Sequence, residues 1–368
     1  AGEAAPPPLA EARARELFAG LRVCEAAVQL EAAEKEEEAG GERTGARAEL
    51  RDAMDMQLRA LGAALERLAG HPGLTEAPGA CLDSAREAEV LLGVPVPTSP
   101  ASLQSRGGGA ADACCGAGKR DVVEVGFDLD AHGRRVEAVV EFFPDGSASL
   151  HWTAFDLPIP MAYVLCLVNE VDLLGEVVPY IVSSGVLHQF ASNEADRLVR
   201  VVSKPPIPFV SGLESVAQRF GFDLLDTPWE ALCLVEMGPE WERPAGAEAE
   251  QWRQVPRPPP FQKGYRQVDV KSVVALGRPV GPEGKLSTIL FSGKGALKVP
   301  RSLLPNWLVT WLVKTIGRLI YQQALERVAT FDSSKFGPRL KDSSFYAELH
   351  RRIAQFANGK AAAASEIP

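Results

Sequence analysis

Few residues of this chain have the types and spacing that catalysis requires. None of the five histidines forms an HxH or HExxH motif or joins a Cys/His cluster, so we expect no metal site and no cofactor. No GxSxG motif occurs, and the segment 292–295 (SGKG) lacks the spacing of a phosphate-binding loop. One enzymatic alternative stays open, in which His188, Asp223 or Tyr265 transfers a proton inside a cavity, as in cyclase or hydrolase chemistry.

Three charged residues stand inside apolar runs of strand length. Arg200 lies in LVRVV, and Asp269 and Lys271 lie in VDVK. Side chains alternate along a strand, so each of the three points either to solvent or to the interior. The pattern favours solvent for Lys271 and leaves both directions open for Arg200 and Asp269. Turned inward, either of these two would contact the polar group of an otherwise apolar ligand.

Charge is distributed unevenly along the 368 residues. The net charge is −9, and because nucleic-acid binding needs a concentrated positive surface, we expect no nucleic-acid partner. The segment 294–360 has twelve Lys or Arg against four Asp or Glu, a local charge of 12 − 4 = +8. This segment suits transient contact with an anionic membrane surface, with Lys314, Arg318 and Arg327 as candidates. A solvated helix face is the alternative.

Cysteine usage and hydropathy indicate a soluble protein of a reducing compartment. The six cysteines form no CxxC pair, and no apolar run approaches the ~20 residues that cross a bilayer. We therefore expect a cytoplasmic protein that can lie peripherally at membranes. The sequence begins without Met, which leaves a removed targeting segment open.

Composition divides the chain into four regions. Residues 1–93 are a helical region, 94–119 a flexible linker rich in Pro, Ser, Gly and Ala, 120–357 the main domain, and 358–368 a disordered tail. Within the main domain, the Pro-rich segment 239–260 reads as a mobile insertion.

Helices are predicted in the first region at 9–38, 46–68 and 81–92. The second of them carries a stripe of apolar side chains at the heptad-like spacing of a coiled coil, formed by Met54, Leu58, Leu61, Leu65 and Leu68. These helices could pack as a small bundle, dock on the main domain or bind a protein partner, and all three possibilities stay open.

The main domain begins with strands and ends with one long helix. Strands are predicted at 122–128, 135–143, 147–152, 186–191, 197–203, 220–225, 230–237, 265–276 and 287–291, with two short helices between 158 and 180. Pro305 opens a helix that runs to about Thr330. Its broad apolar face consists of Trp307, Leu308, Trp311, Leu312, Thr315, Ile316, Leu319 and Ile320. Such a helix must be buried lengthwise.

This order of elements and several local motifs resemble the StAR-related lipid-transfer family over about residues 120–357. The segment 170–174 (EVDLL) followed by Val178-Pro179 resembles the acidic, leucine and proline pattern between the family's two short helices. The segments 204–208 (KPPIP) and 221–225 (GFDLL) are similar to the entry into its middle strands. The segment 304–309 (LPNWLV) resembles its entry to the final helix. Thr310 replaces a common asparagine, and the segment 292–295 replaces the usual Asp-Pro-Lys-Gly turn.

The resemblance implies an α+β helix-grip fold, a curved antiparallel sheet around a long C-terminal helix, preceded here by a small all-α region. It also implies that the protein binds a lipid or other apolar small molecule in an internal cavity and transfers it between membranes without altering it. The candidate cavity-lining residues are Arg200, Val202, Phe222, Val235, Asp269, Leu290, Trp307, Trp311, Leu312, Thr315, Ile316 and Leu319. A protein-interaction scaffold with a filled grip domain is the main alternative.

Overall fold

The computed structural model describes residues 121–131, 133–190, 195–204, 211–227, 229–238, 263–296 and 301–365, together with Gln57 and Leu61. The predicted helical region, the linker and the insertion at 239–260 therefore lie outside the described residues, except for Gln57 and Leu61, which are both helical.

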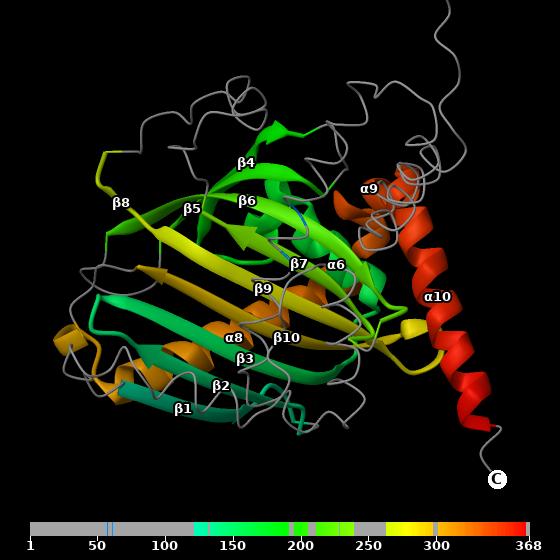
Figure 1. Ribbon diagram of the computed structural model, residues 1–368, viewed down its shortest axis with the longest axis horizontal. Coiled ribbons are helices and arrows are strands. Elements are labelled where there is room, and N and C mark those ends of the chain that lie inside the picture. The colour runs from blue at the N-terminus through cyan, green and yellow to red at the C-terminus, as the bar shows by residue number, and fades with distance from the viewer. Residues whose placement is uncertain are drawn as a thin grey trace, which may run out of the picture.

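One large sheet dominates the described part of the chain (Figure 1). Its ten strands are β1 (Asp121–Asp128), β2 (Arg135–Phe142), β3 (Ser147–Leu157), β4 (Ile181–Gln189), β5 (Arg197–Ser203), β6 (Gly212–Leu224), β7 (Ala231–Met237), β8 (Tyr265–Gln267), β9 (Asp269–Val280) and β10 (Leu286–Ala296). They follow the order β1-β2-β3-β10-β9-β7-β6-β5-β4, and every pair along this path is antiparallel. Only β8 pairs in parallel, with β6.

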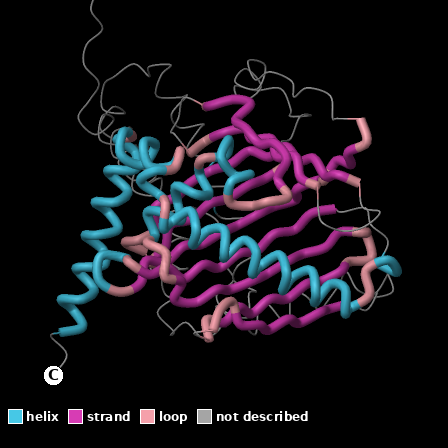
Figure 2. Tube along the Cα trace, turned by 180° about the vertical axis from the view of Figure 1, so that it is seen from behind, coloured by secondary structure: helices cyan, strands magenta, loops and turns pink. Residues whose placement is uncertain are grey.

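The helices lie on one face of this sheet and at one end of it. They are α6 (Met161–Asn169), the 3-10 helix η2 (Val171–Glu176), α8 (Asn306–Ala329), α9 (Phe336–Asp342) and α10 (Ser344–Ser365), with short turns η3 (Pro282–Gly284), η4 (Arg301–Leu303) and η5 (Phe331–Ser333). Figure 2 shows α8 crossing the strands diagonally. We call the face that α8 crosses the inner face and the opposite one the outer face.

The first three strands show why the chain folds this way. In β1 and β2, buried and exposed residues alternate, and register partners such as Val125 and Ala138 point to the same side. These side chains form a core cluster with Leu304, Val309 and Tyr321 from the segment that contains α8. The period-2 apolar pattern of the strands is therefore buried against the 3.6-period face of the helix.

A second core cluster joins α6, α9 and α10. Phe336 of α9, together with Tyr346, Leu349 and Ile353 of α10, packs against α6. Arg352 fastens α10 to the end of β6, since its Nε lies 2.9 Å from Asp223 Oδ2. Helix α10 continues to Ser365, beyond residue 357, where the main domain was predicted to end.

The predicted fold class is confirmed: the described residues form an α+β helix-grip fold in which an antiparallel sheet holds a long helix. Most predicted strands occur, although β6 begins at Gly212, eight residues earlier than expected, because a mixed sequence such as GLESVAQR hides its alternation. The helices α9 and α10 were not predicted from the sequence.

Candidate ligand-binding site

The sheet-facing side of α8 is apolar but incompletely buried. Val309, Val313, Ile316 and Ile320 recur at the spacing that places them on one side of a helix. Val309 is buried in the cluster with β1 and β2, whereas Val313, Ile316 and Ile320 are only half-buried. Ile316 and Ile320 are not among the side chains of the two core clusters above. The middle of the helix therefore keeps accessible apolar surface on the side that faces the sheet.

The inner face of the central strands also carries apolar side chains that are only half-buried. Trp152, Phe291, Ala275 and Leu234 form a row of register partners across β3, β10, β9 and β7. All four are half-buried, and the rings of Trp152 and Phe291 stack with centroids 5.9 Å apart. The inner face of these strands and the side of α8 with Ile316 and Ile320 thus both keep apolar surface that is not completely buried.

Outer-face residues of the same strands are almost completely buried. Val235, Leu276 and Leu290 are next in sequence to Leu234, Ala275 and Phe291, and they are at most 2% exposed. Successive residues of a strand point to opposite faces. The central sheet is thus sealed on its outer face and accessible on its inner face, the face that α8 crosses.

Small residues shape the inner face. A Cβ atom added to Gly277 would lie 2.3 Å from Met161 Cε, so α6 fills this end of the strands. For Gly293, further along β10, the three nearest atoms belong to the Phe291 ring at 3.0 Å and to Val273 at 3.6 Å. The close approach of α6 is therefore seen at the Gly277 end of the inner face.

A row of polar side chains crosses the inner face next to these apolar residues. Gln189, Arg197, Arg219 and Glu236 are register partners on β4, β5, β6 and β7. Arg219, with a side chain only 4% exposed, donates from Nε to Glu236 Oε1 at 2.8 Å. It also donates from Nη1 to the Val168 carbonyl at 2.7 Å. A buried guanidinium needs such partners.

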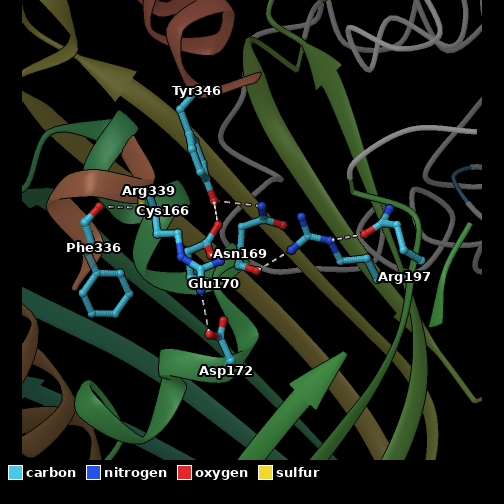
Figure 3. A network of polar contacts seen from close by, with 9 residues as sticks. Cys166, Asn169, Glu170, Asp172, Arg197, Phe336, Arg339 and Tyr346 are labelled. Atoms are coloured by element: carbon cyan, nitrogen blue, oxygen red, sulfur yellow. Dashed lines mark hydrogen bonds and ion pairs between the residues drawn. The ribbon is translucent and has the colours of Figure 1, made fainter. Parts of the chain in front are cut away.

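These arginines also complete the end of α6. The last carbonyls of a helix have no partner within it. Arg219 binds the Val168 carbonyl, and Arg197 Nη1 donates to the Asn169 carbonyl at 3.0 Å (Figure 3). The polar row consequently fixes where α6 ends and where η2 begins.

A buried hydrogen-bond network continues from this junction to the C-terminal helices (Figure 3). The Tyr346 hydroxyl donates to Glu170 Oε1 at 2.6 Å and accepts from Asn169 Nδ2 at 2.9 Å. Arg339 bridges Glu170 and Asp172, with 3.0 Å to each carboxylate. Burial, and then the hydrogen bond to Glu170, raises the pKa of Tyr346. Because every member is held by another, we assign this network to positioning the helices.

The N-terminal end of α8 carries a large exposed apolar surface. Trp307 is 70% exposed, Leu303 65% and Trp311 49%. Arg301 next to them pairs with Asp121, Nε to Oδ2 at 2.6 Å. Tryptophan rings are favoured at membrane–water interfaces, so this surface is a candidate for membrane contact.

Most of the strand residues predicted to line a cavity lie on the outer face. These are Arg200, Val202, Phe222, Val235 and Leu290. Arg200 donates from Nε to Glu214 Oε1 at 2.6 Å, and the Glu214 side chain has no exposed surface. Asp269 is half-buried at the start of β9. A ligand between α8 and the sheet would not contact the five outer-face residues.

The predicted helix residues divide between two sides of α8. Leu312 is buried, and Ile316 and Leu319 are half-buried. Trp307, Trp311 and Thr315 are exposed.

The cations predicted for membrane contact are partly used inside the protein. Arg318 donates from Nε to the Asp128 carbonyl at 3.0 Å, and Arg327 donates from Nε to the Glu176 carbonyl, also at 3.0 Å. Lys314 is half-buried. Arg318 and Arg327 therefore tie α8 to β1 and η2.

The polar pair Arg219 and Glu236 was absent from the sequence-based candidates. Its signal was available, because each is a charge within an apolar strand, as in ALCLVEM for Glu236. The residues of the enzymatic alternative lie on separate elements: His188 contacts Phe190 on the β4 side, Asp223 binds Arg352, and Tyr265 is on β8.

No group of three or more His, Cys, Asp or Glu side chains among the described residues could hold a metal ion. Among the described helices, none is both long and apolar enough to cross a bilayer.

Comparison with known proteins finds likeness at the level of structure. No family model and no curated protein sequence matches the chain. Human STARD10 is similar with a TM-score of 0.41 and 11% identity, covering 68% of this chain and 90% of that one. Human StAR-related lipid transfer protein 5 has a TM-score of 0.41 and 10% identity, covering 67% of this chain and 99% of that one. A STAR-related lipid transfer protein from Xanthomonas axonopodis has a TM-score of 0.35 and 12% identity, covering 54% of this chain and 98% of that one. These three solved structures carry StAR-related lipid transfer names, the family whose motifs the sequence resembles.

Proposed function

We propose that the protein binds an apolar ligand of the lipid class between α8 and the inner face of the sheet and releases it unchanged. The observation that carries this proposal is the contrast between the two faces. Inner residues such as Phe291 and Ala275 stay half-buried under a helix, while their outer neighbours are sealed. A guest with an alkyl chain would restore the missing apolar contacts.

The expected driving force is large enough to extract a lipid. At ~0.8 kcal/mol per buried methylene, a chain of about ten methylenes contributes about 8 kcal/mol when it is fully enclosed. Binding through shape and apolar contact alone would discriminate weakly between similar chains. Chemical selectivity must then come from polar groups at the site.

The Arg219 and Glu236 pair is the polar group that this site offers. It lies one register step from Leu234 on the inner face, and the Glu236 side chain is 17% exposed. We propose that the polar part of the ligand binds next to this pair, with its apolar chain running toward Phe291 and Gly293. A hydrogen-bonding ligand would be favoured over a pure hydrocarbon, because it would complete the coordination of the pair.

We further propose that Leu303, Trp307 and Trp311 place the protein on a membrane during uptake and release. Their exposed surface lies at the N-terminal end of α8. Alanine at both tryptophans should slow lipid transfer between vesicles several-fold and leave retention of prebound lipid unchanged. Phe155→Ala, at another exposed aromatic residue, serves as control. Equal transfer by all three proteins would contradict the membrane role.

Ligand binding itself can be tested with two neighbouring positions of α8. Ile316 faces the sheet and is half-buried, whereas Thr315 is exposed. In Ile316→Trp the larger side chain would occupy the proposed space, so we expect loss of bound lipid with an unchanged far-ultraviolet circular dichroism spectrum. Thr315→Trp adds the same ring on the outside and should retain lipid.

The measurement is native mass spectrometry of the full chain after incubation with mixed phospholipid and sterol vesicles. Bound molecules are then extracted and identified. A wild-type chain that takes up nothing, or an Ile316→Trp variant that binds as well as Thr315→Trp, would overturn the proposed site.

A further inference from the structure

The outer face of the central sheet carries apolar side chains that are almost completely buried. Leu198, Phe222, Val235, Leu276 and Leu290 come from five different strands and are each at most 2% exposed. None of the described helices packs on this face: α8 lies across the inner face, and α9 and α10 stand at the end of the sheet (Figures 1 and 2).

Two residues from the N-terminal region reach this surface. Gln57 and Leu61 are both helical and buried, with 0% and 1% of their surface exposed. Gln57 donates from Nε2 to Asp196 Oδ2 at 3.3 Å, and Gln218 donates from Nε2 to Asp196 Oδ1 at 3.2 Å. Gln218 is an outer-face residue of β6, opposite Leu198 of β5. A residue 139 positions before Asp196 therefore contacts the outer-face side of the sheet.

Gln57 and Leu61 are also separated by one helical turn. Residues four apart lie on the same face of a helix, and Leu61 belongs to the apolar stripe predicted for residues 46–68. The side of the chain that carries Gln57 and Leu61 is therefore buried.

We propose that the amphipathic helix 46–68 covers the outer face of the central strands as an intramolecular third layer. Its length fits: 23 residues at about 1.5 Å each span roughly 35 Å, whereas the six strands from β5 to β3 span roughly 24 Å at about 4.8 Å per strand. The sheet is then held between this helix outside and α8 inside. The proposal does not depend on ligand binding.

Two native cysteines allow a direct test in the full chain. Cys233 lies on the outer face of β7, opposite Phe222 and Leu276. Cys166 lies in α6 on the inner side. Both are buried, and burial raises the pKa of the Cys233 thiol, so that it reacts slowly while covered. Alkylation by iodoacetamide, measured for each cysteine by peptide mass spectrometry, reports the exposure of the outer side at Cys233 and of the inner side at Cys166 separately.

In Leu61→Asp we expect the alkylation rate of Cys233 to rise about tenfold or more, because a carboxylate disfavours an apolar contact. Cys166 should keep its wild-type rate. Leu303→Asp, which adds the same charge at an exposed leucine, should change neither rate.

Protection of Cys233 in Leu61→Asp equal to that in the wild type would overturn the proposal. If both cysteines react faster, the variant has unfolded, and the milder double variant Gln57→Ala with Leu61→Ala decides. Selective exposure of Cys233 then supports the third layer, and continued protection of Cys233 refutes it.

Discussion

A single oxygen atom of Tyr346 is expected to fasten α10 to the rest of the protein. Tyr346→Phe removes the hydroxyl that donates to Glu170 and accepts from Asn169, with oxygen–oxygen and nitrogen–oxygen distances of 2.6 and 2.9 Å. Tyr346 is 3% exposed and the Glu170 side chain 7%. Water therefore cannot take the place of the lost hydroxyl without opening the junction.

The expected loss in the free energy of unfolding depends on the hydrogen-bond partners that Glu170 and Asn169 keep. A hydrogen bond to a charged acceptor is worth about 1.5–3 kcal/mol, and a buried donor left unpaired costs about 1–3 kcal/mol. Glu170 keeps Arg339 on its other oxygen, which reduces the loss. We therefore expect Tyr346→Phe to lower the free energy of unfolding by about 2–4 kcal/mol.

Tyr321→Phe is the matched control. The Tyr321 hydroxyl donates to Asp130 Oδ2 at 2.9 Å, and Asp130 also binds Arg134. Because that carboxylate is partly exposed to water, the control should lose only about 1 kcal/mol.

The assay is urea unfolding of both variants, followed by tryptophan fluorescence and circular dichroism. The midpoint should shift while the slope with denaturant stays constant. A loss for Tyr346→Phe no larger than that for Tyr321→Phe would refute the view that this network holds the C-terminal helices.

Three further predictions concern the same framework. Because burial raises the folded-state pKa of Tyr346 above its unfolded value, the unfolded chain releases this proton first, so stability falls as pH rises above about 10; in Tyr346→Phe this fall should be shallower by up to about 1.4 kcal/mol per pH unit, measured by urea unfolding. Gly317→Ala should lower the melting temperature, because its Cβ would lie 2.8 Å from a phenylalanine ring of β1, whereas Gly359→Ala, with open space around it, should raise stability by about 1 kcal/mol. Arg352→Met breaks an ion pair with a buried aspartate and should cost about 3–5 kcal/mol. Arg351→Met, at an exposed pair, should cost far less in the same unfolding assay.

The long helix and the hairpins could be predicted because their signals are local. Pro305 marks the beginning of α8, and an uninterrupted apolar pattern carries it to Ala329. The strands β1, β2 and β3 are joined by short turns, and their alternation survives because the outer side of β1 is exposed. Where one face meets water and the other a core, sequence periodicity reports the structure directly.

The orientation of the central strands could not be predicted for the opposite reason. In β7 both faces are apolar, since Leu234 points inward and Val235 outward. A strand that carries apolar side chains on both faces shows no alternation. A shift of one residue exchanges the two faces, which is why Phe222 and Val235 were assigned to the interior while Leu234 and Ala275 were not.

Helix α10 was missed although it carries a usable pattern. Tyr346, Leu349, Ile353 and Ala357 are buried at spacings of three and four residues. Charged residues surround them, so the segment reads as a polar tail unless that spacing is counted. Its partners, Glu170 and Asp223, lie more than 120 residues earlier, and no local signal announces contacts of that range.

The asymmetry between the two faces explains how a protein could keep an unfilled interior without unfolding. Each fully buried Leu, Val or Phe contributes about 1.5–3 kcal/mol, so the five sealed outer-face residues named above contribute on the order of the whole net stability of a domain. That contribution does not depend on a guest between α8 and the sheet. If helix 46–68 supplies the cover and leaves the lipid affinity unchanged, removing it should lower the free energy of unfolding by the same amount with and without bound lipid, because the ligand adds the same term to both proteins. The N-terminal helix and the ligand would then stabilise the same sheet from opposite sides.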